Sequence, residues 1–367
     1  MQLTDSKESI LRILFGSWKL PVLFALFEGL THFGVWTADS TAYVSILKVA
    51  RGVASTEEMQ FAHWHGILRP VVPFLALPLS FVVSYSDAIA TVNLGFFLVG
   101  TLFTYLFTKR LFDSRTAFVS AMLYASAAPN LKFGIAILTD GPGYAMQIIL
   151  LYFALSVLEK RNDLRASVLG GVLIGIGVLT KETSLTILVF LLVRFLTQKD
   201  RLTVANLLVV AVVSLVIPLA WSQVVGYSYL GTYVMGLEYK TPGYKGPLVN
   251  PQQFMVSAGL AFYLSLPFAF LAFFAIDDKR FKTMCAILLA AGAVLMLWPT
   301  GPEDRITFLA FPAVLPLAAV GMSQVSQVLA RRPLFEIVRQ ELWVGVIVVA
   351  AIATTNIATF RLWFRIP

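Results

Sequence analysis

Long apolar segments alternate with short polar ones along almost the whole chain. A helix that crosses a membrane needs roughly 20 mainly apolar residues, with about 17 as a lower limit. Segments of about that length occur near residues 19–36, 88–107, 116–131, 142–158, 166–180, 183–198, 203–224, 254–275, 283–299, 306–323 and 342–360. This pattern predicts an all-α, polytopic membrane protein with a transmembrane bundle of about 11 helices.

One further apolar run, Leu68 to Ser84, does not fit this pattern. It contains Arg69 and the prolines Pro70, Pro73 and Pro78. Proline removes backbone hydrogen bonds, and lipid offers no replacement for them. We therefore expect this run to form an interfacial helix at the outer membrane surface, with a re-entrant path as the alternative.

The distribution of lysine and arginine favours the same topology. If 68–84 does not cross and the N-terminus is cytoplasmic, 18 of the 28 basic residues lie on the inner side, against 10 if it crosses. Because cytoplasmic loops are rich in Lys and Arg, the non-crossing arrangement is preferred. It predicts an extracytoplasmic C-terminus, a first outer loop over 37–87 with interfacial helices, and a later outer loop over 227–253.

Composition narrows the class of protein further. The chain is 58% hydrophobic and 13% charged, and no polar block reaches domain size, so we expect residues 1–367 to form a single transmembrane catalytic module without a soluble domain. The net charge of +8 comes from small clusters between apolar segments, which indicates topology signals rather than a nucleic-acid-binding face. Cys285 is the single cysteine, which excludes an internal disulfide and a Cys-based metal site.

Two carboxylates follow apolar segments on the predicted outer side. Asp39 lies in W-T-A-D-S-T-A-Y and Asp140 in T-D-G-P-G-Y. Each fits a solvated helix cap, since Asp, Ser and Thr favour that position. Together they could instead bind a divalent cation (Mg or Mn), or position a hydroxyl nucleophile with one of them as general base.

Other polar residues on the predicted outer side are candidates for anion binding. Lys181 and Glu182 interrupt two apolar runs; they either pair with each other, reach the interface, or face a cavity. Arg305 suits a phosphate, because a guanidinium matches phosphate oxygens bidentately, although pairing with Glu303 or Asp304 is the alternative.

The histidines give weaker signals. His63 and His65 are two residues apart and do not share a helix face, so a metal site there would need extended backbone, and we expect one of them to donate a hydrogen bond in the pocket. Glu28 and His32 are four residues apart in the first apolar segment, which fits either a proton pathway or a buried pair.

The order of these features resembles the GT-C superfamily of polyprenyl-phosphate-sugar-dependent glycosyltransferases, in the branch of protein O-mannosyltransferases and lipid A aminoarabinose transferases. The resemblance covers about residues 15 to 325. It rests on A-D-S-T-A-Y, H-G-I-L-R-P-V-V-P-F-L, T-K-R-L-F-D-S-R, I-L-T-D-G-P, G-I-G-V-L-T-K-E-T-S-L and D-R-I-T-F-L-A-F-P-A-V-L-P-L-A.

The resemblance implies an inverting transfer of a sugar from a polyprenyl-phosphate donor to a hydroxyl of a glycan, lipid or protein, on the extracytoplasmic or luminal side. A prokaryotic plasma membrane is the expected location. Asp39 corresponds to the catalytic base and Asp140 to a residue that supports a metal or the substrate. The expected phosphate and substrate ligands are Lys181, Glu182, Arg305, Arg69, His65 and Tyr43. Ser40 follows Asp39 where the mannosyltransferases have an acidic residue, which argues against protein O-mannosylation.

Two other functions remain open at this stage. A membrane transporter or lipid flippase would use Glu28, His32, Lys181 and Glu182 as a charge relay, but the chain shows no internal repeat of the kind that many transporters have. A structural subunit of a larger complex would leave the charges on the outer side without a pocket.

Overall fold

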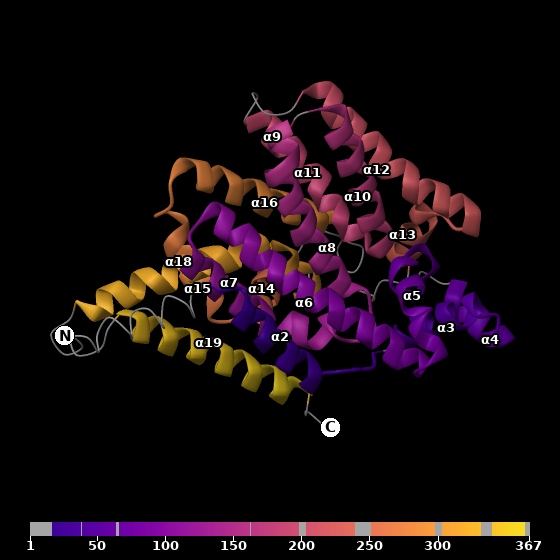
Figure 1. Ribbon diagram of the computed structural model, residues 1–367, viewed down its shortest axis with the longest axis horizontal. Coiled ribbons are helices and arrows are strands. Elements are labelled where there is room, and N and C mark those ends of the chain that lie inside the picture. The colour runs from indigo at the N-terminus through magenta and orange to yellow at the C-terminus, as the bar shows by residue number, and fades with distance from the viewer. Residues whose placement is uncertain are drawn as a thin grey trace.

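The computed structural model describes residues 17–37, 39–63, 66–161, 163–197, 203–238, 251–297, 303–331 and 340–363. Every regular element within these ranges is helical (Figure 1). The all-α class predicted from the apolar periodicity is therefore confirmed.

Each of the eleven apolar segments contains a helix. In chain order these are α2 (Lys19–Thr31), α6 (Tyr85–Leu111), α7 (Ser114–Ala125), α8 (Asp140–Phe153), α10 (Leu164–Thr180), α11 (Thr186–Thr197), α12 (Val204–Val225), α14 (Pro251–Phe262) with α15 (Ser265–Phe273), α16 (Asp278–Leu297), α18 (Phe311–Ala330) and α19 (Gln340–Trp363).

Fewer of these helices meet a strict criterion of length and apolarity. Within the described ranges four do so, Tyr85–Leu111, Asp140–Arg161, Val204–Val225 and Asp304–Ala330, and a fifth arises if α14 and α15 are one bent span. The membrane character of the chain is supported, and the count of eleven spans stays a prediction.

Several helices begin at a polar residue that the sequence places just before the apolar run. The side chains of Ser84, Asp113, Asp163 and Thr203 each accept a hydrogen bond from a backbone N–H in the first turn of α6, α7, α10 and α12. Such caps satisfy donors that the helix itself leaves free. They set the starts of the helices and hence the short loops between them.

The segment after α2 folds into short helices that gather at the start of α6 (Figure 1). They are α3 (Ser40–Ala50), α4 (Thr56–His63), η1 (Gly66–Leu68), α5 (Val71–Ala76) and η2 (Leu79–Phe81). None is long enough to cross a bilayer. The proline-rich run thus forms separate short turns rather than the single interfacial helix that we expected, because its prolines interrupt the backbone hydrogen bonds, and it exposes Phe74, Leu75, Phe81, Val82 and Val83.

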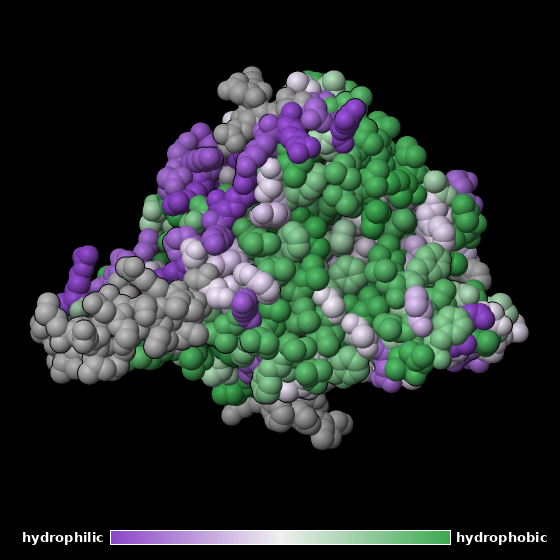
Figure 2. Space-filling view, viewed as in Figure 1, coloured by the Kyte–Doolittle hydropathy of each residue, from purple (hydrophilic) through white to green (hydrophobic). Residues whose placement is uncertain are grey.

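The surface carries a broad hydrophobic area across the middle of the molecule, with hydrophilic residues along one edge and at the opposite corner (Figure 2). Exposed apolar side chains include Leu208, Val212, Val216 and Leu219 of α12. An apolar belt between two polar edges is what a lipid bilayer requires of a helical protein.

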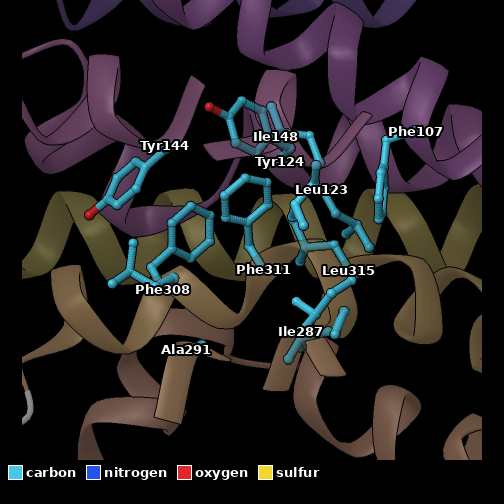
Figure 3. Packing of buried hydrophobic residues seen from close by; sticks show 14 of the residues in the cluster. Phe107, Leu123, Tyr124, Tyr144, Ile148, Ile287, Ala291, Phe308, Phe311 and Leu315 are labelled. Carbon is cyan, nitrogen blue, oxygen red and sulfur yellow. The ribbon is translucent and has the colours of Figure 1, made fainter. Parts of the chain in front are cut away.

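The core between α7, α8 and α18 is aromatic. The rings of Phe308 and Phe311 stack with centroids 5.1 Å apart, and Tyr144 and Tyr124 pack on them at 5.1 and 5.0 Å (Figure 3). Aromatic contacts of this kind add stabilisation beyond their buried area. This core supports α17 (Asp304–Thr307) and the start of α8, where the candidate site lies.

Candidate active site

Asp39 immediately precedes α3 but does not act as its cap. Its side chain makes no capping hydrogen bond, and the nearby Thr37 N–H donates to Ser40 Oγ instead, at 2.8 Å. The Asp39 carboxylate lies 3.8 Å from Arg305 Nη1, and 39% of its side chain is exposed. The helix-cap alternative is therefore wrong for Asp39, whose carboxylate is accessible and faces a cation.

Arg305 is held in a polar cluster on α17. Its Nε donates to Glu303 Oε2 at 2.6 Å, so the neighbour pairing considered from the sequence does occur. Its backbone carbonyl accepts a hydrogen bond from the Tyr144 hydroxyl at 2.7 Å. The guanidinium keeps its Nη atoms on the side of Asp39, because Glu303 occupies Nε.

Asp140 and Lys181 form a buried ion pair. Asp140 is the first residue of α8, and its Oδ1 lies 2.5 Å from Lys181 Nζ, with both side chains almost fully excluded from solvent. Lys181 leaves α10 in an extended conformation. A methyl group on Gly143 would come within 2.9 Å of Lys181 Cδ, so this glycine lets the lysine pass along α8.

Burial lowers the pKa of the Lys181 ammonium, and the positive charges of Arg69 and Arg305 act in the same direction, while Asp140 opposes them. Asp140 thus stabilises the charged form of Lys181, whereas burial and the two neighbouring guanidinium groups destabilise it. A buried group with a shifted pKa and a specific charged partner marks a candidate functional site.

Arg69 and Glu182 form a second ion pair, at the same end of the bundle. Arg69 Nε donates to Glu182 Oε2 at 2.8 Å, and its Nη2 donates to the other carboxylate oxygen. Burial acts to raise the pKa of the Glu182 carboxyl, but the positive charges of Arg69 and Lys181 act more strongly in the opposite direction. The pKa of this carboxyl therefore lies below its ordinary value. Lys181 and Glu182 therefore pair with separate partners, and of the alternatives left open by the sequence the mutual ion pair does not form.

Tyr43 links this pair to the start of α8. Its hydroxyl accepts from Arg69 Nη1 at 2.8 Å and hydrogen-bonds Thr139 Oγ1 at 3.0 Å, one residue before Asp140. Asp140 also interacts electrostatically with Arg69 and Arg305. The structure thus brings together residues that the sequence analysis had selected from five separate segments: Asp39, Tyr43, Arg69, Asp140, Lys181, Glu182 and Arg305.

The remaining predicted residues are placed elsewhere or lie outside the described ranges. His65 and the side chain of His63 are among the residues that the structure does not describe. Oε2 of Glu28 lies 3.8 Å from Nδ1 of His32, four residues later in the chain. Oε1 of Glu28 accepts a hydrogen bond from Asn356 Nδ2 of α19 at 3.3 Å. This contact joins the first and last described helices, and supports the buried-pair interpretation.

No group of three or more His, Cys, Asp or Glu side chains in the described ranges is arranged to hold a metal ion. The two carboxylates proposed as metal ligands each face a cation, Asp39 the guanidinium of Arg305 and Asp140 the ammonium of Lys181. Neighbouring positive charges disfavour a divalent cation, so this residue set does not fit one well.

Several residues that the sequence analysis missed hold the loops of the site. Trp221 Nε1 and Tyr229 Oη donate to the carbonyls of Ile67 and Leu68, at 2.9 and 2.8 Å. Asn93 Nδ2 donates to the carbonyls of Ala136 and Leu138, at 2.5 and 2.8 Å. Of these three residues, only Asn93 stands out in the sequence, as an amide within an apolar segment. All three bind backbone carbonyls, and no side-chain pattern in the sequence reveals such contacts.

Comparisons with known proteins agree with this geometry. Residues 69–222 match the family model described as dolichyl-phosphate-mannose-protein mannosyltransferase, a range that includes Arg69, Asp140, Lys181 and Glu182. The fold matches ArnT from Cupriavidus metallidurans with a TM-score of 0.58 and 16% identity, over 94% of this chain and 71% of ArnT. Residues 69–222 thus resemble this mannosyltransferase family, and the fold of the described chain resembles that of ArnT.

The same fold appears in two further solved structures. ArnT from Cupriavidus metallidurans bound to undecaprenyl phosphate matches with a TM-score of 0.57 and 17% identity, over 94% of this chain and 72% of ArnT. The archaeal oligosaccharyltransferase AglB from Archaeoglobus fulgidus, in complex with an inhibitory peptide and a dolichol-phosphate, matches with a TM-score of 0.61 and 17% identity, over 93% of this chain and 55% of AglB. No curated protein matches the sequence significantly.

Proposed function

We propose that this chain is a GT-C-type glycosyltransferase that transfers a sugar from a polyprenyl-phosphate donor to a hydroxyl acceptor, with inversion, at the extracytoplasmic face of the membrane. The observation that supports it best is the accessible Asp39 carboxylate beside Arg305, adjacent to the buried Lys181–Asp140 pair. The solved relatives were captured with undecaprenyl phosphate and with a dolichol-phosphate, which agrees with a lipid-linked donor.

Asp39 is the proposed general base. Its carboxylate takes the proton of the acceptor hydroxyl as the hydroxyl oxygen attacks the anomeric carbon of the sugar. The bond between that carbon and the phosphate oxygen breaks, and the electron pair leaves with the polyprenyl phosphate. A single displacement inverts the anomeric centre. Asp39 suits this role better than Asp140, because Asp39 is half-exposed and Asp140 is buried in its ion pair.

Arg305 is the proposed direct ligand of the departing phosphate, and the Lys181 ammonium, buried against Asp140, adds positive charge behind it. A preorganised cation that faces developing negative charge lowers the barrier without reorganisation during the reaction. Asp140 then holds Lys181 in place and keeps it charged. Arg69 is already bonded to Glu182 and Tyr43, so we assign these three residues to positioning the first loop against the Lys181 turn rather than to direct contact with the phosphate.

We propose that the transfer needs no bound divalent cation, because Arg305 and Lys181 already supply positive charge next to both carboxylates. The AglB structure in complex with Zn and sulfate shows that a relative of this fold was crystallised with a metal. Transfer by this chain should therefore persist in EDTA. Loss of transfer in EDTA that Mg or Mn restores would contradict the proposal.

The test of the function uses the purified chain in nanodiscs with radiolabelled undecaprenyl-phosphate sugars. Wild-type protein should release undecaprenyl phosphate and label a hydroxyl acceptor. Asp39→Asn should lower the rate by about a thousandfold or more, since it removes the base but keeps the shape. Asp87→Asn is the matched control, because Asp87 lies at the start of α6 on a separate cap. A wild-type rate in Asp39→Asn would refute the base assignment.

The transporter or flippase alternative predicts movement of substrate without transfer. Its proposed relay is not continuous in the structure, because Glu28 pairs toward α19 whereas Lys181 and Glu182 pair with Asp140 and Arg69. Uptake into vesicles by the same preparation, with no sugar transfer from any donor, would favour the transporter.

A further inference from the structure

The helix pair α14 and α15 is sharply broken. The two helices pass the test for a membrane span only together, and they are bent by 104° at the break. Tyr263 lies at this break with φ of +42°, in the left-handed region. Glycine is the usual residue there, and a tyrosine costs about 1 kcal/mol or more. A tyrosine thus occupies a position where the backbone is strained.

The Tyr263 side chain is also unsatisfied. Its hydroxyl oxygen is buried and has no hydrogen-bond partner among the described residues. A buried polar group without a partner costs about 1–3 kcal/mol. Tyr263 combines two unfavourable features, and strain of this kind concentrates where a ligand is bound.

The surroundings of Tyr263 belong to the candidate site. Helix α14 packs against α17, and the ring of the preceding residue, Phe262, lies 5.5 Å from Phe308 in the aromatic core. The Tyr263 phenol interacts electrostatically with Asp304, whose carboxylate is 3.7 Å from Lys132 Nζ. The Asp304 carboxylate is therefore the charged group that acts on this phenol.

We propose that Tyr263 binds a ring hydroxyl of the sugar carried by the lipid-linked donor. The inference rests on the proposed function. The Asp304 carboxylate disfavours an anion at this phenol, whereas a sugar hydroxyl both donates and accepts hydrogen bonds and suits a phenol beside a carboxylate. The sugar is bonded directly to the phosphate that Arg305 would hold, and Arg305 adjoins Asp304. Irregular backbone at membrane depth is tolerated where it lines a cavity, which the break at Tyr263 would do.

The test compares the affinity of the full chain in nanodiscs for a sugar-bearing lipid and for the bare lipid. The probes are undecaprenyl-phosphate mannose, glucose and N-acetylglucosamine, and undecaprenyl phosphate alone. Tyr263→Phe keeps the ring and should reduce the preference for the favoured sugar-bearing lipid about two- to tenfold, with the affinity for undecaprenyl phosphate unchanged. Tyr152→Phe is the matched control, because Tyr152 packs against Phe103 farther along α8 and should keep the wild-type preference.

A second variant separates the backbone from the side chain. Tyr263→Gly relieves the left-handed strain, so it should fold with an unchanged or higher Tm and show the same loss of preference. A wild-type preference in either Tyr263 variant would overturn the assignment. If wild-type protein itself prefers no sugar-bearing lipid and releases no undecaprenyl phosphate, the proposed function fails instead.

Discussion

The chemistry of single residues in this chain is decided by their immediate partners. Asp39 and Asp140 occupy equivalent places in the sequence, each just beyond an apolar segment and at the start of a helix. In the structure Asp140 is almost fully buried against Lys181, and Asp39 keeps 39% of its side chain exposed. One carboxylate is therefore suited to positioning a cation, and the other to accepting a proton.

The lowered pKa of Lys181 gives a pH dependence with a definite sign. Burial shifts the loss of its proton to a pH below the ordinary value of 10.5, so donor binding should weaken on the alkaline side earlier than for an exposed lysine. Lys181→Arg retains a charge throughout that range, and its alkaline limit should move to higher pH. The measurement is kcat/KM against pH for both proteins. The same alkaline limit in the two would contradict this role.

The Arg69–Glu182 pair should behave as a coupled unit. Arg69→Ala or Glu182→Gln alone leaves the other partner poorly compensated, so each should destabilise the protein strongly. The double variant should be less destabilised than the sum of the two, with a coupling of about 1–3 kcal/mol. Unfolding in detergent, followed for all four proteins of the cycle, measures this. Additive losses would show that the two side chains act independently.

At the scale of elements, the site depends on close approach of α8 to η3 (Asn130–Gly134). A methyl group on Gly141, at the second position of α8, would come within 2.0 Å of the Gly134 carbonyl oxygen. Neither atom belongs to a flexible side chain, so the start of α8 would have to shift. Asp140 precedes this glycine and would move with it.

Gly141→Ala should therefore lower both stability and activity. Overpacking of this kind costs about 1–3 kcal/mol. The matched control is Gly95→Ala in α6, where a methyl group meets no atom within 4 Å and alanine favours the helix, so its stability should be unchanged or slightly higher. The measurement is Tm together with the rate of undecaprenyl phosphate release. A Gly141→Ala protein as stable as the wild type would show that the contact is dispensable.

The sequence predicted the elements better than their contacts. The apolar segments located all the long helices, and the prolines of 68–84 indicated that this run forms no membrane-spanning helix, because these signals are local. It also selected the charged residues of the site. It left the pairing of Lys181 with Glu182 open, and the two side chains have separate partners where Lys181 leaves α10 in an extended conformation. Contacts from side chains to backbone, such as Trp221 to Ile67, have no signal in the sequence at all.

At the scale of the whole molecule, two polar ends are separated by the hydrophobic belt (Figure 2). One end holds Asp39, Arg69, Lys181 and Arg305. Toward the other ends of α11 and α16, Arg194 pairs with Glu159 and donates to Thr283 at 2.7 Å. The distribution of lysine and arginine predicts that this second end faces the cytoplasm.

Labelling with a membrane-impermeant maleimide tests that orientation. Cys285 is the single cysteine, so a Cys285→Ser background allows one new cysteine at a time. Thr56→Cys, on the exposed start of α4, should react in intact spheroplasts, because the first loop is predicted to be extracytoplasmic. Arg161→Cys, at the exposed end of α9 (Glu159–Arg161), should react only after permeabilisation. The reverse pattern would place Asp39 on the cytoplasmic side and refute the proposed sidedness of the transfer.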